Sequence, residues 1–193
     1  MKRAAVLSVF CLWPVVASAA EYSSVYTKFD LDTCKVIEKG DEYVYAGTWR
    51  CKGYKGIDVI QASSDDRSYV AFGRNGKDHC AFKKTFNRFN TALSPIEWRL
   101  KDGVPFAAIE RWSVVTDDNG NSVTWLVINA LKKNNSCHAH YIAGSYPDAN
   151  AHARQAADDL AGDFNCDTDA PTVDSKIGEP GINMDACKDL GKE

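Results

Sequence analysis

The chain has 193 residues, of which 45% are hydrophobic, and its 23 basic and 26 acidic side chains give a net charge of −3. This length supports one domain with a sizeable core and does not require two. A mildly acidic chain without a run of Lys or Arg offers no electrostatic basis for binding nucleic acid or an anionic membrane surface. Both classes of partner are therefore excluded from the expected function.

Residues 1–20 have the pattern of a cleavable secretory signal peptide. Lys2 and Arg3 precede an apolar run over residues 4–16, and the small residues 17–20 suit signal peptidase. About 13 apolar residues are too few for the roughly 20 that a helix needs to span a bilayer. We therefore expect a periplasmic or secreted protein with no membrane span after cleavage and with a net charge of −5.

The first part of the remaining chain contains three strand signals. Runs rich in Val, Ile, Tyr and Trp cover Tyr43–Cys51, Ile57–Ser63 and Arg67–Gly73, with Gly-, Ser- and Asp-containing turns between them. The segment Asn75–Ser94 shows no clear period, and we interpret it as a loop with one helical turn around Cys80.

Turn dipeptides organise the next part of the chain into a four-stranded meander. Asp102-Gly103 and Asn119-Gly120 accept the positive φ angles of a type I′ turn, and Asn134-Asn135 is a weaker third signal. The predicted strands are Ile96–Leu100, Val104–Val115, Val123–Leu131 and Cys137–Ala143. Centring a two-residue turn on each dipeptide pairs Lys101 with Val104, Asp118 with Asn121, and Lys133 with Ser136.

These registers bring polar side chains together on one face of the sheet. Glu110, Asn129 and His140 fall in one row across three strands, and His138 lies one step along the same face. The opposite face collects Ile96, Trp98, Ile109, Leu126, Ile128, Ala139 and Tyr141. Because both faces of the Val123–Leu131 strand are apolar, we expect this strand to be covered on both sides.

A helix and a tail follow the meander. Alanines, Leu160 and Phe164 recur at helical spacing over Pro147–Asp163, which predicts a helix packed on the sheet. Residues 167–193 are rich in Asp, Pro, Gly and Lys and predict a flexible acidic tail. The expected fold is therefore a single α+β domain over residues 21–166, with a mostly antiparallel β-sheet of about seven strands in two meanders and one C-terminal helix.

Six cysteines remain after removal of the signal segment, and they are expected to form disulfides. An even number of cysteines in an exported chain favours a disulfide framework, and the absence of a C-x-x-C pair makes the alternative, a structural zinc site, less favoured. Sequence alone leaves 15 connectivities open, although Cys166 is the nearest candidate partner for Cys187. The six are Cys34, Cys51, Cys80, Cys137, Cys166 and Cys187.

The polar row has three possible roles: catalysis, metal binding and structure. A carboxylate beside an imidazole could act as a general base, and Glu110 with His138 and His140 could hold a divalent metal. The favoured interpretation is a structural row of hydrogen-bonded polar residues. Since the chain has no nucleophile elbow, phosphate-binding loop, dinucleotide fingerprint or H-E-x-x-H motif, no catalytic residue and no cofactor is predicted.

A second candidate surface is the short loop that follows Cys51. Lys52, Tyr54 and Lys55 alternate with two glycines there, and an exposed aromatic side chain between lysines is a suitable contact for a partner. Tryptophans at strand positions are instead expected in the core. The loop is therefore the predicted partner-binding segment.

Several segments resemble a family of small exported, disulfide-containing proteins of unknown function from Gram-negative bacteria. The resemblance covers the chain from about Tyr22 to Cys166, and it implies export and a disulfide-bonded domain without implying any catalytic residue. Its carriers are Ser24-Val25-Tyr26-Thr27 with Asp30-Leu31 and Cys34, Trp49-Arg50-Cys51-Lys52-Gly53-Tyr54-Lys55-Gly56-Ile57, Ile96-Glu97-Trp98-Arg99-Leu100, and Asp148-Ala149-Asn150-Ala151.

Two classes of function follow from these observations. The first is a non-enzymatic module of the cell envelope that binds another exported protein or a cell-wall component, with inhibition of a hydrolase as a narrower version based on analogy. The alternative is a metal-binding protein or hydrolytic enzyme that uses the Glu110, Asn129 and His140 row. Metal content and the effect of replacing His140 distinguish the two classes.

Overall fold

The computed structural model describes residues 19–40 and 46–190. All but the last two residues of the proposed signal peptide, residues 1–20, lie outside the described residues. The described residues form ten strands in two sheets, one α-helix that continues into a π-helical turn, and short 3-10 turns. This arrangement confirms the expected α+β class, with more strands than the seven expected.

The larger sheet has six strands in the order β1-β6-β7-β8-β9-β10. It contains the predicted four-stranded meander, β6 to β9, and all its neighbours are antiparallel except β9 and β10, which are parallel. The outer strands β1 and β10 were not predicted. The bounds are β1 (Tyr22–Thr27), β6 (Asn90–Lys101), β7 (Val104–Val115), β8 (Ser122–Lys132), β9 (Asn135–Ala143) and β10 (Thr172–Asp174).

The smaller sheet has four antiparallel strands in the order β2-β3-β4-β5. Three of them confirm the strand signals in the first part of the chain, although residues 43–45 of the first predicted strand are outside the described residues. The fourth, β2, was not predicted. The bounds are β2 (Lys35–Lys39), β3 (Gly47–Lys52), β4 (Asp58–Ser64) and β5 (Arg67–Phe72).

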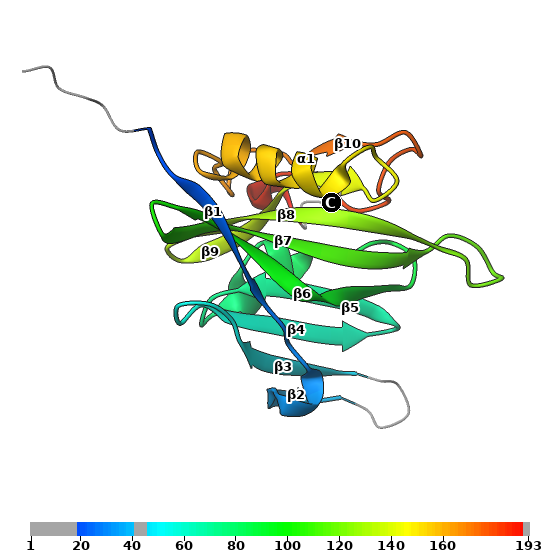
Figure 1. The fold of residues 1–193 in the computed structure, drawn as a ribbon. Helices are drawn as coiled ribbons and strands as arrows, with labels where there is room; N and C mark the ends of the chain where they lie inside the picture. Colours follow the sequence, from blue (N-terminus) through cyan, green and yellow to red (C-terminus); the bar gives the residue numbers. More distant parts are fainter. Residues whose placement is uncertain (1–18, 41–45, 191–193) are drawn as a thin grey trace, which may run out of the picture.

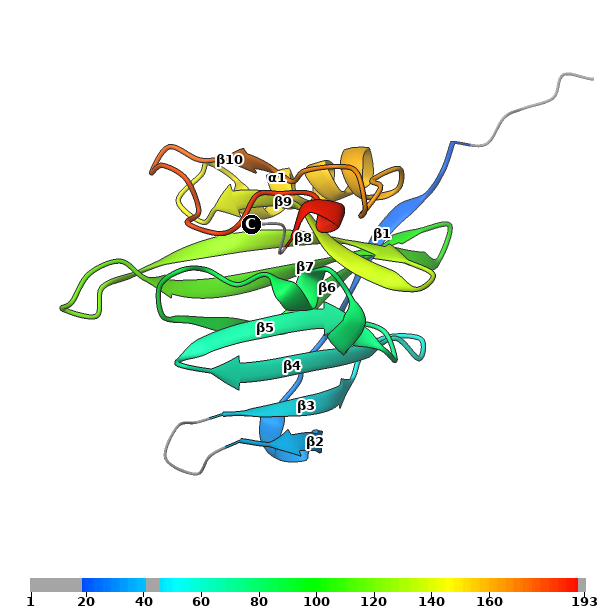
Figure 2. The same ribbon diagram turned by 180° about the vertical axis from the view of Figure 1, so that it is seen from behind.

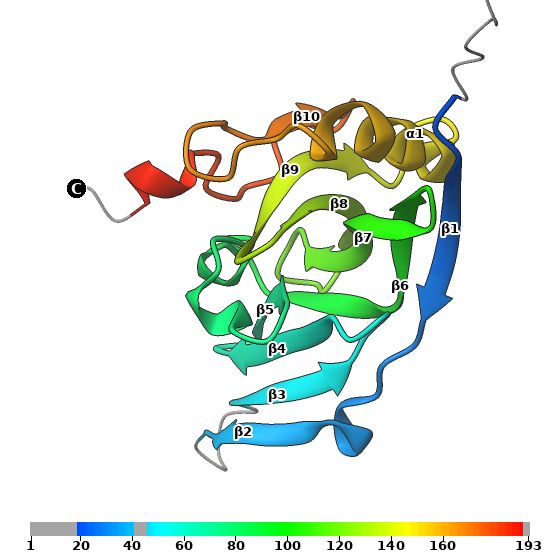
Figure 3. The same ribbon diagram turned by 90° about the vertical axis from the view of Figure 1, so that its left-hand side faces the viewer.

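The molecule has three layers, which Figures 1 and 2 show from opposite sides. Strands β2 to β5 cover one face of the six-stranded sheet, and the helix α1 (Ala149–Ala156) with its continuation η4 (Ala157–Ala161) covers the other. In Figure 3, β1 runs down the edge of the larger sheet and leads through η1 (Leu31–Thr33) into β2 of the smaller sheet. The central strand β8 is therefore covered on both faces, as predicted.

Each layer boundary has its own apolar core. Between the two sheets, large aromatic side chains pack together, and Trp98 and Trp112 are completely buried. Between the sheet and the helix, the small side chains of Ala149, Ala153, Ala157 and Ala161 are buried against β7, β8 and β9. Because alanine projects only a methyl group, the helix lies close to the sheet and buries apolar area on both elements.

Two β-bulges change which side chains share a face. A register shift between Arg99 and Leu100 turns Trp98 toward the smaller sheet, and a shift between Ile128 and Asn129 turns Tyr141 the same way. The expected placement of Ile96, Trp98 and Tyr141 on the opposite face is therefore wrong. A bulge adds one residue to one strand, so every residue beyond it changes face.

Two of the three turns also differ from the prediction, one in length and one in position. The Asp102-Gly103 turn pairs Lys101 with Val104 as predicted. The next hairpin closes with Val115 opposite Ser122, and the last closes with Lys132 opposite Asn135, so both registers shift by two residues. A shift of two preserves the face of each side chain but changes its neighbours.

The described residues form three disulfides: Cys34–Cys51, Cys80–Cys187 and Cys137–Cys166. The prediction of a disulfide framework is confirmed, whereas the suggested partnership of Cys187 with Cys166 is wrong. Covalent cross-links of this number are typical of proteins that mature in an oxidising compartment.

The segment expected to be a flexible tail is packed against the domain up to residue 190. Its strand β10 pairs with β9, Ile182 is buried and bridges Phe86, and Cys187 is bonded to Cys80 beside the turn η3 (Ala81–Lys83). The composition of this segment is that of a loop, but a disulfide and a few apolar anchors are enough to hold it in place.

Candidate functional site

The carboxyl group of Glu110 is buried at the centre of the predicted polar row. Its Oε2 accepts a hydrogen bond of 2.8 Å from Trp112 Nε1, and its Oε1 accepts one of 3.4 Å from Asn129 Nδ2. Burial raises the pKa of this carboxyl to about 8, although the bond from Trp112 acts in the opposite direction. Glu110 is therefore mostly protonated at neutral pH.

His138 lies on the same face as Asn129, which is its partner across β8 and β9. Its Nδ1 hydrogen-bonds the Tyr141 hydroxyl at 2.7 Å, and its Nε2 has no hydrogen-bond partner among the described residues. Burial, with a smaller effect from the positive charge of Lys84, lowers the pKa of His138 to about 3. The imidazole is thus neutral and sealed from solvent, which fits the favoured structural interpretation of the row.

His140 lies on the other face of the sheet, because the bulge opposite it separates its face from that of Glu110. Its Nδ1 is 2.6 Å from Thr172 Oγ1, and its Nε2 is 3.2 Å from Asp174 Oδ2. These contacts attach β10 to β9. The row of Glu110, Asn129 and His140 is therefore not formed, which corrects the sequence-based arrangement.

The metal candidates Glu110, His138 and His140 are thus not gathered at one point. Over residues 19–40 and 46–190, no group of three His, Cys, Asp or Glu side chains is placed to hold a metal ion. The catalytic and metal alternatives consequently lose the geometry on which they depended.

The predicted partner-binding loop is anchored at two of its three candidate residues. Tyr54 packs its ring 6.4 Å from that of Trp98, and Lys55 donates a hydrogen bond of 2.7 Å from Nζ to the carbonyl oxygen of Gly103. Lys52 instead lies exposed at the end of β3, where it lines a groove. Tyr54 and Lys55 are therefore held in place within the molecule, and Lys52 is the one of the three candidates that lines the groove.

We call this groove the basic groove. Its volume is about 520 Å³, and it lies between the β1–β2 connection and strands β2, β3 and β4. Four of its lining side chains are cationic and one is acidic, in a chain whose net charge is −3. The lining residues are Lys28, Phe29, Thr33, Cys34, Lys35, Arg50, Cys51, Lys52 and Asp58.

The positive charge of the basic groove is only partly neutralised. Asp58 Oδ2 is 3.8 Å from Arg50 Nε, a buried atom that makes no hydrogen bond. The side chains of Lys28, Lys35 and Lys52 make no ion pair or hydrogen bond with any residue that the structure describes. Like charges held close together favour the binding of an anion, because an anion relieves their repulsion.

Sequence reasoning identified Lys52 and missed the other cations of the basic groove. Lys28, Lys35 and Arg50 are far apart in the chain and meet only because β2 pairs with β3, with Lys35 opposite Arg50, and because Cys34 is bonded to Cys51. The one usable signal was the cysteine pair, since each of these two cysteines has a basic residue beside it in the sequence.

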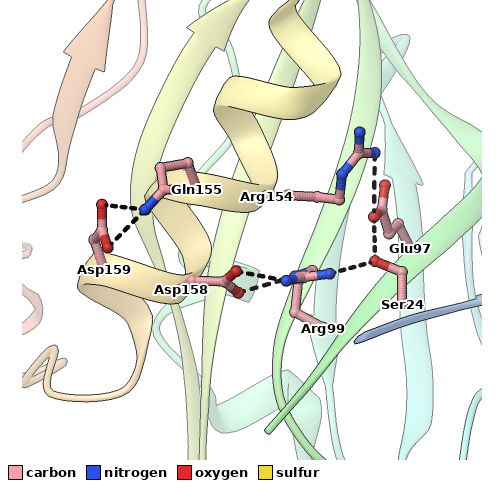
Figure 4. Close-up of polar contacts among 7 residues, drawn as sticks. All are labelled: Ser24, Glu97, Arg99, Arg154, Gln155, Asp158 and Asp159. Carbon is pink, nitrogen blue, oxygen red and sulfur yellow. Dashed lines mark hydrogen bonds and ion pairs between the residues drawn. The ribbon is translucent and has the colours of Figure 1, made fainter. Parts of the chain in front are cut away.

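A second polar cluster joins the helix layer to the edge of the larger sheet (Figure 4). Arg99 donates from Nε and Nη2 to the two carboxylate oxygens of Asp158, at 2.9 and 2.5 Å, and from Nη1 to Ser24 Oγ at 2.7 Å. Glu97 accepts from Ser24 and lies 3.6 Å from Arg154. The side chains of Arg99 and Asp158 are only 7% and 15% exposed. The cluster therefore stabilises the packing of the helix layer on the sheet and is not an open site.

No helix among the described residues is long and apolar enough to cross a membrane. Comparison of the chain with protein-family models, with curated proteins and with solved structures gives no match.

Proposed function

We propose that the protein is an exported, non-enzymatic binding module, periplasmic or secreted, that recognises an anionic region of another envelope or secreted protein through the basic groove. The observation that carries this proposal is the gathering of Lys28, Lys35, Arg50 and Lys52 around one cavity with a single acidic neighbour. The resemblance to small exported bacterial proteins and the three disulfides support the location.

The groove is built on a rigid frame, which favours binding. The bond between Cys34 and Cys51 fixes the start of β2 against β3, and the contacts of Tyr54 and Lys55 fix the adjoining loop. A surface that is already ordered loses little conformational entropy when a partner binds. Inhibition of a hydrolase is a narrower version of this function, and it would use the same face.

Binding of poly-L-glutamate to the purified, oxidised protein, measured by calorimetry at low and at physiological salt, tests the proposal. We expect binding that weakens as salt screens the charges. The double variant Lys28→Glu with Lys52→Glu should bind at least about tenfold more weakly, since two attractions become repulsions.

The matched control is Lys133→Glu with Lys188→Glu, which changes the net charge equally at exposed positions outside the groove lining. It should bind within about twofold of the unmodified protein. Equal losses in the two double variants would show that poly-L-glutamate senses overall charge only. Absence of binding at low salt would also refute the proposal.

A further inference from the structure

Strand β2 is the outermost strand of the smaller sheet, and it is unusually exposed. In the described part of the chain it pairs with β3 alone, so its other edge has no strand partner. All five of its side chains are exposed, including Val36 at 45% and Ile37 at 36%. An edge of this kind presents backbone donors and acceptors that another strand can pair with.

The charges of β2 select the kind of strand that can pair with it. Glu38 forms an ion pair with Lys77, so its charge is neutralised within the molecule. Lys35 and Lys39 make no ion pair with a described residue, and Lys35 also lines the basic groove. The edge therefore carries two unpaired positive charges, one at each end of the strand. A register shift between Val36 and Glu38 leaves Lys35 opposite Arg50 and Lys39 opposite Gly47, so the two lysines lie on opposite faces of the sheet.

A second copy of this chain is a poor partner for the edge. In an antiparallel pair centred on Ile37, Lys35 of each strand would face Lys39 of the other, and in an in-register parallel pair each lysine would face its own copy. Like charges directly opposite each other destabilise a strand pair. An acidic strand has the opposite effect, because its carboxylates would lie across from Lys35 and Lys39.

We propose that β2 receives an extended acidic segment of the partner protein as an added strand, with the carboxylates directed to Lys35, Lys39 and the adjoining basic groove. This inference rests on the proposed function and specifies its partner. Backbone hydrogen bonds along β2 supply affinity that does not depend on sequence, and Lys35 and Lys39 select acidic side chains on both faces of the added strand.

The test uses an eight-residue peptide that repeats Glu-Glu-Val-Val, so that carboxylates lie on both faces, blocked at both ends, and a second version N-methylated along both edges. The N-methyl groups remove strand hydrogen bonds while leaving the charges unchanged. We expect the unmodified peptide to bind at least about tenfold more tightly than the N-methylated version. We also expect it to slow hydrogen exchange of the backbone amides of β2.

The variant Lys39→Glu distinguishes binding at the β2 edge from binding in the basic groove, because Lys39 belongs to β2 and does not line the groove. It should weaken peptide binding several-fold, whereas Lys133→Glu should not. Equal affinity for all peptide versions would refute strand addition while leaving the proposed function intact, since the groove then acts by charge alone. Failure of both the peptides and poly-L-glutamate to bind would refute the two together.

Discussion

Replacing Glu110 with Gln should remove a large pH dependence from the stability of the protein. The Glu110 carboxyl has a pKa of about 8 in the folded state because it is buried, against 4.5 when solvated. Between these two pH values the folded protein holds a proton that the unfolded chain has lost. The free energy of unfolding therefore falls as pH rises, by about 1.4 kcal/mol per pH unit at most.

Integrated from pH 5 to pH 8, this difference in proton binding destabilises the protein by roughly 3.5 kcal/mol. His138 acts in the opposite direction at lower pH. Its pKa of about 3 in the folded state lies below the ordinary 6.5, so its contribution to stability is present above pH 6.5 and is lost as pH falls toward 3. The two effects partly cancel between pH 4.5 and 6.5, and only a comparison of variants separates them.

The assay is urea unfolding of the wild-type protein and of Glu110→Gln at pH 5, 6, 7 and 8. Gln is neutral at every pH and retains an oxygen for the Trp112 donor, which lies 2.8 Å from the carboxylate. Between pH 5 and pH 8, the free energy of unfolding of the variant should rise by about 3.5 kcal/mol relative to that of the wild-type protein. The exposed Glu179→Gln serves as control, and a constant difference between wild type and Glu110→Gln would refute the reasoning.

Two further predictions concern contacts between layers. Asp158→Asn should cost about 3 kcal/mol, because it leaves the buried Arg99 guanidinium without its counter-charge, whereas the exposed neighbour Asp159→Asn should change stability by less than about 0.5 kcal/mol. Thermal unfolding measures both, and equal effects would contradict the assignment. Replacing Cys80 and Cys187 together with serine should cost about 4 to 5 kcal/mol, because their bond spans 107 residues. Denaturant unfolding measures this loss, and an unchanged midpoint would contradict the expected role of the bond.

The strands of the meander were predictable because apolar alternation and turn dipeptides are local signals. Which side chains share a face of the sheet was not predictable. The two bulges that change the faces of Trp98 and His140 have no recognisable sequence signal. Each bulge makes the side chains beyond it point to the opposite face of the sheet. The strands were therefore assigned correctly, whereas the predicted row of Glu110, Asn129 and His140 was wrong.

The candidate site was predictable only in part. Lys52 was identified from the loop in which it lies, but β2 has five exposed residues and so lacks the half-buried pattern by which strands are recognised. The strand exists because Cys34 ties its start to β3 and because β3 supplies hydrogen bonds. Both are long-range causes, and neither can be read from local propensity.

The disulfide pattern has a consequence for the order in which the protein matures. The bond between Cys137 and Cys166 lies wholly inside the segment that Cys80 and Cys187 close, so the two are nested. Oxidation in the order of synthesis would join Cys80 to Cys137, the next cysteine along the chain, before Cys187 exists. The native pairing therefore requires either folding before oxidation or exchange of a misplaced bond by an isomerase. The yield of native protein should accordingly depend on disulfide rearrangement and not on oxidising power alone.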